Sequence, residues 1–256
     1  MISQSVETLD GWYALHVIYK MDWHAWNQLE QTTKKEFVKE LQTVIKDWKQ
    51  VEIDENGSHY LWNVTGHKGD WGIFLLRPEL KDLNDAENRL TTLKIYDYLN
   101  PVHSYVSVME LGTYSGMPKT ETGMKRAKAH MYPILPKDEY ICFYPMNKVR
   151  AGDINWYTLP YEKRQELMKE HGMIGRKYAG KIHQYITGSI GFDDHEWGVT
   201  LLANDPLQFK KIIYEMRFSE ASSVYSDFPY FIVGRSLNDD EALENYFRCQ
   251  LSRVEK

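Results

Sequence analysis

His171 is a residue whose type and position raise the question of a chemical role. It lies in the stretch KEHGMIG (169–175), where the glycines at 172 and 175 predict the end of an amphipathic helix that covers about 160–171. One interpretation is a solvated imidazolium at a helix end, stabilised by the helix dipole by about 0.3–1 kcal/mol. The other is a neutral imidazole that binds a metal, and its second ring nitrogen then needs a hydrogen-bond acceptor. The pattern alone favours the solvated end.

The kinds of metal that one histidine could hold are limited. No Cys or His partner stands at a spacing suited to zinc, and the two cysteines, Cys142 and Cys249, form no metal-binding motif. An iron that is already held by the four nitrogens of a porphyrin needs only one protein ligand. A lone histidine is therefore compatible with a haem-type site.

A tyrosine and a lysine stand close together in the stretch FYPMNK (143–148). Tyr140 and Tyr144 fall on one face of a predicted strand, since successive residues of a strand alternate between its two faces. Pro145 lacks a backbone donor, which predicts that regular pairing ends there and leaves Tyr144 at the strand end with Lys148 nearby. A buried tyrosine with a satisfied hydroxyl is the ordinary interpretation of such a position.

The elements that must position these residues occur twice in the chain. WGIFLL begins at Trp71, and WGVTLL begins 126 residues later at Trp197. The same offset aligns two further pairs of apolar segments, YALHVIY (13–19) with EYICFYP (139–145) and HSYVSVM (103–109) with PYFIVGR (229–235). A chance match of the WG segments is the alternative interpretation, but the shared order of elements in the two halves disfavours it.

Each half has the order strand, helix, strand, strand, helix, strand. This order is the ferredoxin-like unit, an antiparallel sheet with helices on one face. Because the other face must be covered, the predicted fold is α+β, two fused ferredoxin-like halves that form a barrel-like core with helices outside. The predicted elements are strands at about 12–19, 58–66, 70–77 and 102–112 with helices at about 32–48 and 79–98, then strands at about 139–145, 178–190, 195–203 and 225–235 with helices at about 160–171 and 205–218.

The predicted organisation is an N-terminal half over 1–112, a linker over 113–138 and a C-terminal half over 139–256 that carries the site. The linker is rich in Gly, Pro, Ser and Thr and shows no periodicity, so we expect an irregular, flexible segment. Over 113–137 it carries five basic side chains and one acidic side chain, a net charge of +5 − 1 = +4. It is either a solvated linker or a flap that meets an anion.

The composition excludes several classes of function. The formal net charge of −5 over 256 residues disfavours a general nucleic-acid binder. The N-terminus has no basic start followed by an apolar run, and no stretch reaches the ~20 apolar residues of a spanning helix. We therefore expect a soluble, cytoplasmic protein with no membrane span. Its 18 Tyr, 8 Trp and 9 Phe can fill a core and also line a pocket for a flat ligand.

The chain resembles the chlorite dismutase-like haem superfamily, and specifically its coproheme decarboxylase branch in Gram-positive bacteria. The resemblance covers nearly the whole chain and depends on dense local matches. These matches are LDGWYALH (9–16) and ENRL (87–90) in the first half, and CFYPMNK (142–148), NWYTLP (155–160), HGMIGRKYAGK (171–181), GSIGFDDHEWGVTL (188–201) and EMRFSEAS (215–222) in the second.

The resemblance implies a role for particular residues. It makes His171 the proximal iron ligand, Tyr144 a redox-active tyrosine and Lys148 a proton-delivering residue. Gln184 is the distal residue, and because the chlorite-decomposing branch carries arginine there, this position argues against chlorite decomposition. The other implied contacts with the porphyrin are Pro145, Met146 and Asn147, which form a loop with Tyr144 and Lys148, together with Trp156 and the carboxylate-binding Arg217 and Ser222.

One position departs from the family pattern. Relatives carry an arginine fourteen residues before the tyrosine, where this chain has His130. Two alternatives stay open for the contact with a propionate, namely a protonated His130 or the nearby Lys128.

The implied activity is the hydrogen peroxide-dependent oxidative decarboxylation of iron-coproporphyrin III (coproheme) at two of its four propionates. The product is haem b, and the reaction is the last step of coproporphyrin-dependent haem biosynthesis. The resemblance also implies a homopentamer that makes a transient contact with the iron-inserting chelatase. The alternatives on the same fold are a haem peroxidase, a chlorite-degrading enzyme, a haem-binding carrier or sensor, and a cofactor-free oxygenase that would leave His171 unused.

Overall fold

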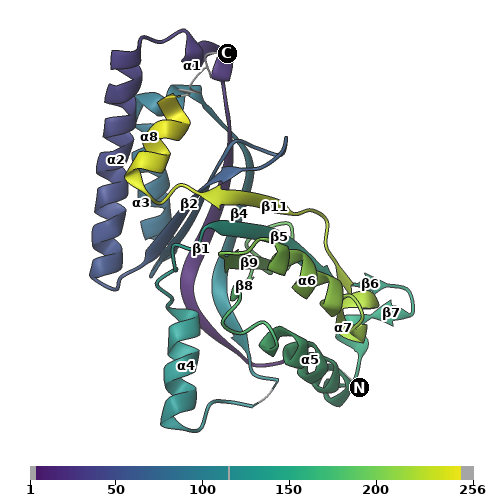
Figure 1. Ribbon diagram of the computed structural model, residues 1–256. Coiled ribbons are helices and arrows are strands. Elements are labelled where there is room, and N and C mark those ends of the chain that lie inside the picture. The colour runs from purple at the N-terminus through teal and green to yellow at the C-terminus, as the bar shows by residue number, and fades with distance from the viewer. Residues whose placement is uncertain (1–3, 115, 249–256) are drawn as a thin grey trace.

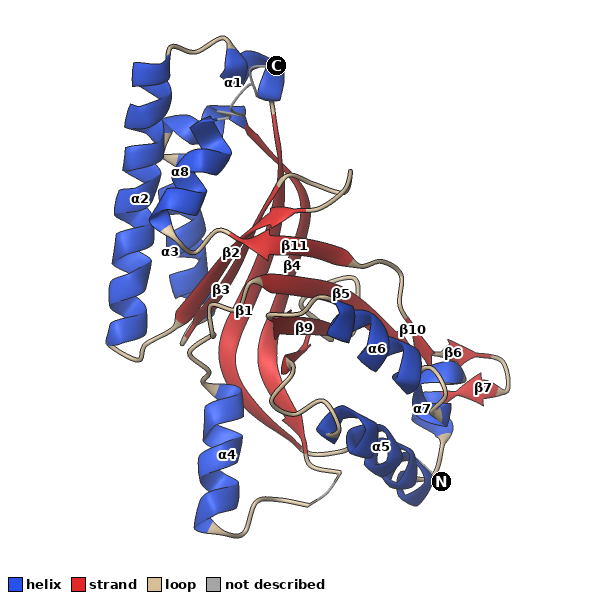
Figure 2. Cartoon of the chain, viewed as in Figure 1, coloured by secondary structure: helices blue, strands red, loops and turns tan. Residues whose placement is uncertain are grey.

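The computed structural model describes residues 4–114 and 116–248. Two sets of four long strands share one curved sheet, and helices cover its outside (Figure 1, Figure 2). The strands of the first half are β1 (Thr8–Met21), β2 (Ser58–Val64), β3 (Trp71–Arg77) and β4 (Leu99–Gly112), and those of the second half are β5 (Tyr140–Lys148), β8 (His183–Gly188), β9 (Trp197–Ala203) and β11 (Ile232–Ser236).

The two halves order their strands in the same way. Neighbouring strands run β2–β3–β1–β4 in the first half and β8–β9–β5–β11 in the second, and every pair is antiparallel. The last strand of each half pairs with the second strand of the other, β4 with β8 and β11 with β2. These two junctions close the strands into a barrel, which confirms the predicted α+β fold of two ferredoxin-like halves.

Aromatic side chains from both halves fill the inside of the barrel. The His16 ring lies between the rings of Phe74 and Phe143, with both centroid distances 4.0 Å, and its Nε2 is 2.8 Å from Thr200 Oγ1. Burial lowers the pKa of His16 to about 3, so this ring is neutral at ordinary pH. The barrel interior is therefore a packed core, and a ligand site must lie outside it.

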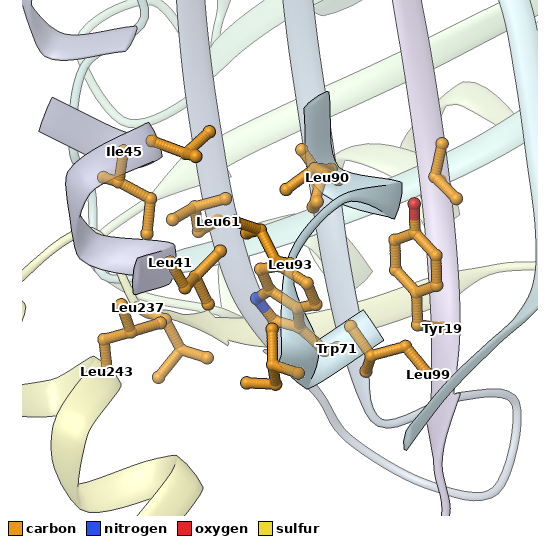
Figure 3. Close-up of a cluster of buried hydrophobic side chains, with 14 of the residues drawn as sticks. Tyr19, Leu41, Ile45, Leu61, Trp71, Leu90, Leu93, Leu99, Leu237 and Leu243 are labelled. Carbon is orange, nitrogen blue, oxygen red and sulfur yellow. The ribbon is translucent and has the colours of Figure 1, made fainter. Parts of the chain in front are cut away.

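Helices from both halves close the outer face of the first-half sheet. They are α2 (Gln31–Ile53), α3 (Leu80–Thr91) and α8 (Asp240–Arg248). Figure 3 shows Ile45 and Leu41 of α2 packed with Trp71 of β3 in one apolar cluster. Ile45 is the residue that the 126-residue offset aligns with His171, and it is only 2% exposed. This face of the first half is therefore part of its core.

The second half covers its outer face with α5 (Tyr161–Arg176), α6 (Leu207–Met216) and the short α7 (Glu220–Ser223). The prediction that the first of these helices ends at His171 is wrong, because α5 continues through Gly172 and Gly175. Each glycine costs a helix about 1 kcal/mol relative to alanine, and the packing of α5 against α6 and α7 offsets that cost. His171 lies more than a turn from the helix end, so the dipole argument for a charged ring does not apply.

The segment that joins the halves contains a helix, α4 (Glu121–Met131), where the sequence predicts irregular structure over 113–138. The prediction fails here because Ala, Met and Lys favour a helix, and Ala127 is buried against the barrel. The α4 backbone approaches β1 so closely that a Cβ at Gly11 would lie 2.1 Å from the Met131 carbonyl oxygen. Only glycine allows this contact.

Several boundaries differ from those that the sequence predicts. The ladder between β5 and β9 continues past Pro145, which pairs with Gly198, because a proline lacks a donor on one side of its strand only. The expected helix over 79–98 divides into α3 and a 3₁₀ turn. Among the described residues, no helix is long and apolar enough to span a membrane. Cys142 is buried, and Cys249 lies outside the described residues.

The remaining elements are short. They are α1 (Trp23–Asn27), η1 (Lys94–Tyr98), β6 (Arg150–Ala151), β7 (Ile154–Asn155), η2 (Trp156–Thr158) and β10 (Ser226–Asp227).

Glu52, near the end of α2, fixes the last part of the joining segment to the barrel. One of its carboxylate oxygens accepts hydrogen bonds from Ser58 Oγ at 2.7 Å, the His59 backbone N at 2.8 Å and Lys137 Nζ at 2.6 Å. We expect Glu52→Ala to lower the free energy of unfolding by about 3 kcal/mol, because buried donors lose their acceptor. Urea unfolding measures the change. Glu36→Ala, on the exposed side of the same helix, should change little, and equal losses would contradict this role.

Candidate functional site

A cavity of about 320 Å³ lies against the outer face of the second-half sheet, beneath α5 and α6. Two of the eleven candidate residues, Pro145 and Asn147, do not line it. The two-residue period of β5 turns them away, and the Asn147 side chain instead accepts from the Glu196 backbone N at 3.0 Å. The other nine line the cavity: His130, Tyr144, Met146, Lys148, Trp156, His171, Gln184, Arg217 and Ser222.

His171 enters the cavity from α5. Burial lowers its pKa to about 4, and the nearby charge of Lys148 adds to the effect, so the ring is neutral at pH 7. Its Nδ1 lies 3.2 Å from Ser219 Oγ. Because Nδ1 is engaged, Nε2 is the ring nitrogen that is left for a ligand in the cavity. This environment fits a neutral metal ligand and not a solvated imidazolium.

Tyr144 enters the same cavity from the sheet. It is 5% exposed, and its ring packs against Phe228 and Phe231 with centroid distances of 5.8 and 4.8 Å. Burial raises the pKa of Tyr144, while the charge of Arg217 partly opposes that shift. The phenol is therefore neutral, and oxidising it requires the loss of both an electron and the hydroxyl proton.

Lys148 lies on the same face of β5, two residues beyond Met146. Its Nζ donates to Ser226 Oγ at 3.0 Å and lies 4.1 Å from the centroid of the Trp156 ring. Burial lowers the pKa of Lys148 to about 8, although the charge of Glu196 opposes the shift. This ammonium is thus held in the cavity wall at a pKa close to physiological pH, where it can gain or lose a proton.

The edge of the cavity is cationic and its walls are apolar. The Arg217 guanidinium lies 4.0 Å from the centroid of the Phe228 ring, at the end of α6, and Ser222 is a buried hydroxyl on α7. With Lys148 they supply two cations and a hydroxyl for carboxylates. Such a slot suits a flat apolar ligand with carboxylates on its rim. The apolar walls are Met168, Ile186, Val199, Ile213, Met216 and Phe228.

Gln184 and His130 approach the cavity from other elements. Gln184 extends from β8, on the sheet side that faces α5, and its Nε2 lies 3.4 Å from the Gly175 carbonyl oxygen. His130 extends from α4. Burial lowers the pKa of its ring, and a hydrogen bond with the Glu110 backbone partly opposes that shift. Lys128 does not line the cavity, so of the two alternatives His130 is the one in place, as a neutral hydrogen-bonding group.

The first half also contributes to the cavity, which the sequence did not predict. Glu110, Leu111 and Gly112 at the end of β4 line it, because β4 pairs with β8 where the ring closes. The Glu110 carboxylate accepts from Trp197 Nε1 at 3.1 Å, and burial raises its pKa. The duplication in the sequence could have indicated this contribution. When two duplicated sheets close into one barrel, the last strand of one half pairs with the second strand of the other.

Known proteins are similar to this chain in sequence and in structure. A family described as chlorite dismutase matches residues 34–237. Coproheme decarboxylase from Staphylococcus carnosus is 51% identical over 249 residues, which cover 96% of this chain and 100% of that protein. Coproheme decarboxylase from Staphylococcus saprophyticus is 52% identical over 239 residues, which cover 93% and 96%.

Solved structures agree with these matches. A haem-binding protein from Thermus thermophilus has a TM-score of 0.91 and 41% identity, over 96% of this chain and 98% of that one. A chlorite dismutase variant from Candidatus Nitrospira defluvii, at 18% identity and a TM-score of 0.75 over 93% and 96%, shares the fold. The structure is an α+β barrel with a cavity outside the barrel, beneath two helices. By its sequence, the chain belongs to the chlorite dismutase family.

Proposed function

We propose that this protein is a coproheme decarboxylase, which uses hydrogen peroxide to convert two propionates of iron-coproporphyrin III into vinyl groups and releases haem b. The observation that carries the proposal is one cavity that holds an available His171 Nε2, the buried phenol of Tyr144 and the ammonium of Lys148. Curated coproheme decarboxylases that are 51% and 52% identical over nearly the whole chain support it.

The residues of the cavity fit an iron porphyrin better than a bare metal ion. Within residues 4–114 and 116–248, no cluster of three or more His, Cys, Asp or Glu could hold a metal. One histidine suffices when a porphyrin supplies four nitrogens. His171 Nε2 would bond to the iron of the substrate, the apolar walls would contact the macrocycle, and Arg217 and Ser222 would bind propionates at the rim.

The reaction balances with one peroxide for each carboxylate removed. Each propionic acid side chain and one hydrogen peroxide give one vinyl group, one carbon dioxide and two waters. When bound, the iron porphyrin would supply the oxidising power, with peroxide as its source. The buried phenol of Tyr144 would give up its electron and proton and then take a hydrogen atom from a nearby propionate. The resulting propionate radical would lose carbon dioxide and a proton as its second electron passes to the remaining oxidising equivalent from peroxide, which leaves the vinyl group.

Lys148 would supply or accept the proton that accompanies this transfer. It shares a face of β5 with Tyr144, and its pKa of about 8 places both protonation states within reach. Gln184 also lines the cavity and would be available to contact peroxide there. As an uncharged amide it lacks the cation that would hold an oxyanion, in agreement with the argument against chlorite decomposition.

The pKa of Lys148 predicts how substrate binding depends on pH. Below a pH of about 8 the ammonium attracts a propionate, and above it the neutral amine does not. We expect the affinity for coproheme to fall by up to about tenfold between pH 7 and pH 9, as the protonated fraction falls about tenfold. Fluorescence quenching titrations measure this affinity. The arginine of Lys148→Arg stays charged, so the affinity of that variant should change little between pH 7 and pH 9. An equally steep loss of affinity in the variant would show that another group causes the pH dependence.

Mass spectrometry of the porphyrin after the addition of peroxide tests the proposed function. The expected result is two successive losses of carbon dioxide from coproheme, which end at the mass of haem b. A carrier or sensor would leave the mass unchanged, and a peroxidase would oxidise an added phenol without decarboxylation. Oxygen release from added chlorite would point to the chlorite-degrading alternative.

Assembly and location stay predictions. The resemblance implies a cytoplasmic homopentamer, and light scattering of the purified protein would measure its mass. It also implies a transient contact with the iron-inserting chelatase, which a cross-linking experiment with that enzyme would detect.

A further inference from the structure

The hydroxyl of Ser219 connects the candidate iron ligand to the backbone of α6. Ser219 is completely buried, just after the end of α6. Its Oγ donates to the Met216 carbonyl oxygen at 2.8 Å, and His171 Nδ1 lies 3.2 Å from the same Oγ. A serine hydroxyl has only one proton to donate. The Met216 carbonyl oxygen can only accept and lies closer to Oγ than Nδ1 does, so the hydroxyl donates its proton to that carbonyl. The Ser219 oxygen is then an acceptor toward His171, so Nδ1 carries a proton.

We propose that Ser219 is a positioning residue that holds the His171 proton on Nδ1 and so directs the lone pair of Nε2 into the cavity. The inference rests on the proposed role of His171 as the iron ligand, and it adds a residue that the family resemblance did not assign. An outer partner of this kind sets both the tautomer and the orientation of a ligating ring. Ser219 is suited to this role because its hydroxyl donates to the Met216 carbonyl, which fixes the direction of that hydroxyl and leaves the oxygen free to accept from His171.

The opposite arrangement makes a different prediction. If the Ser219 hydroxyl donated to a bare Nδ1, the His171 proton would lie on Nε2, and the ring could not bind iron without first moving that proton. Nitrogen-15 NMR of the histidine side chains separates the two arrangements in the porphyrin-free protein. We expect a protonated Nδ1 and a bare Nε2 for His171. A proton on Nε2 would overturn the proposal.

Two variants test the role of the hydroxyl. Ser219→Ala removes the acceptor and should shift the His171 tautomer towards a mixture. Ser219→Thr keeps a hydroxyl and should restore the tautomer of the natural protein. Ser223→Ala is the matched control, since Ser223 Oγ donates to the Ser219 backbone carbonyl at 3.0 Å and is more exposed. An Nδ1–H tautomer that persists in Ser219→Ala would overturn the proposal.

Binding measurements separate a positioning role from a structural one. We expect Ser219→Ala to weaken coproheme binding by roughly tenfold, the lower end of the effect of losing an outer partner of a metal ligand. Binding of iron-free coproporphyrin III should not change, because no ligand bond is made to it. Equal losses for the two porphyrins would show a damaged cavity and contradict the proposal. These readouts need no turnover, so they can hold even where peroxide produces no carbon dioxide.

Discussion

Replacing His171 with alanine is expected to weaken coproheme binding by about 100-fold or more and to shift the Soret band. His171 is the only histidine that enters the cavity from α5, and its Nδ1 is already engaged by Ser219. Loss of an outer partner alone costs about 10–100-fold in metal affinity, so loss of the ligand itself should cost at least as much. Titration of coproheme into the purified variant, followed by absorbance, measures both effects.

The controls separate loss of the ligand from damage to the fold. His67→Ala removes an exposed histidine from the turn between β2 and β3 and should bind coproheme normally. In His171→Gly, added imidazole should enter the space of the lost ring and restore the Soret band. A Soret band and affinity in His171→Ala that match the natural protein would refute the ligand assignment.

Replacing Tyr144 with phenylalanine is expected to leave coproheme binding nearly unchanged and to slow the first loss of carbon dioxide by roughly 100-fold or more. The ring would still pack against Phe228 and Phe231, so the cavity should keep its shape. The missing hydroxyl removes the group that transfers the electron and proton. Single-turnover mass spectrometry with a fixed amount of peroxide measures the rate.

Tyr140 provides the matched control for this experiment. It lies on the same face of β5 and packs against the same apolar cluster as Tyr144, but it does not line the cavity. Tyr140→Phe should therefore form haem b at the rate of the natural protein. Formation of haem b at that rate by Tyr144→Phe would rule out the proposed role of its phenol.

The duplication made most of the fold predictable from the sequence. The short apolar strands repeat after 126 residues and in the same order relative to the amphipathic helices, so the element order and the barrel both follow. Helix ends were harder to predict, because tertiary packing decides whether α5 passes Gly172 and Gly175. The α4 helix was missed because the glycines and prolines around it hide a short helical stretch of Ala, Lys and Met.

The candidate site was predictable where a residue has a distinctive type, as His171, Tyr144 and Lys148 have. Their roles came from the resemblance and not from their spacing, since a helical histidine and a buried tyrosine each have ordinary interpretations. Ser219 was missed because serines are common near helix ends and only three-dimensional contacts show which one meets a histidine. Glu110 was missed because the closed ring, and not the sequence order, brings β4 to the cavity.

The two halves differ on the outer faces of their sheets. In the first half, Ile45 and Trp71 fill the space between sheet and helix with apolar side chains (Figure 3). In the second half, α5 and α6 leave a cavity over the sheet, and a histidine takes the place of the isoleucine. The two halves thus share the barrel, and the cavity lies on the outer face of the second half.

A crystal structure of the protein with bound coproheme is the most direct measurement. We predict electron density that joins the iron to His171 Nε2, with a propionate beside the Tyr144 hydroxyl. Iron bound to any other side chain, or a Tyr144 hydroxyl that is separated from every propionate, would contradict the proposed site and chemistry.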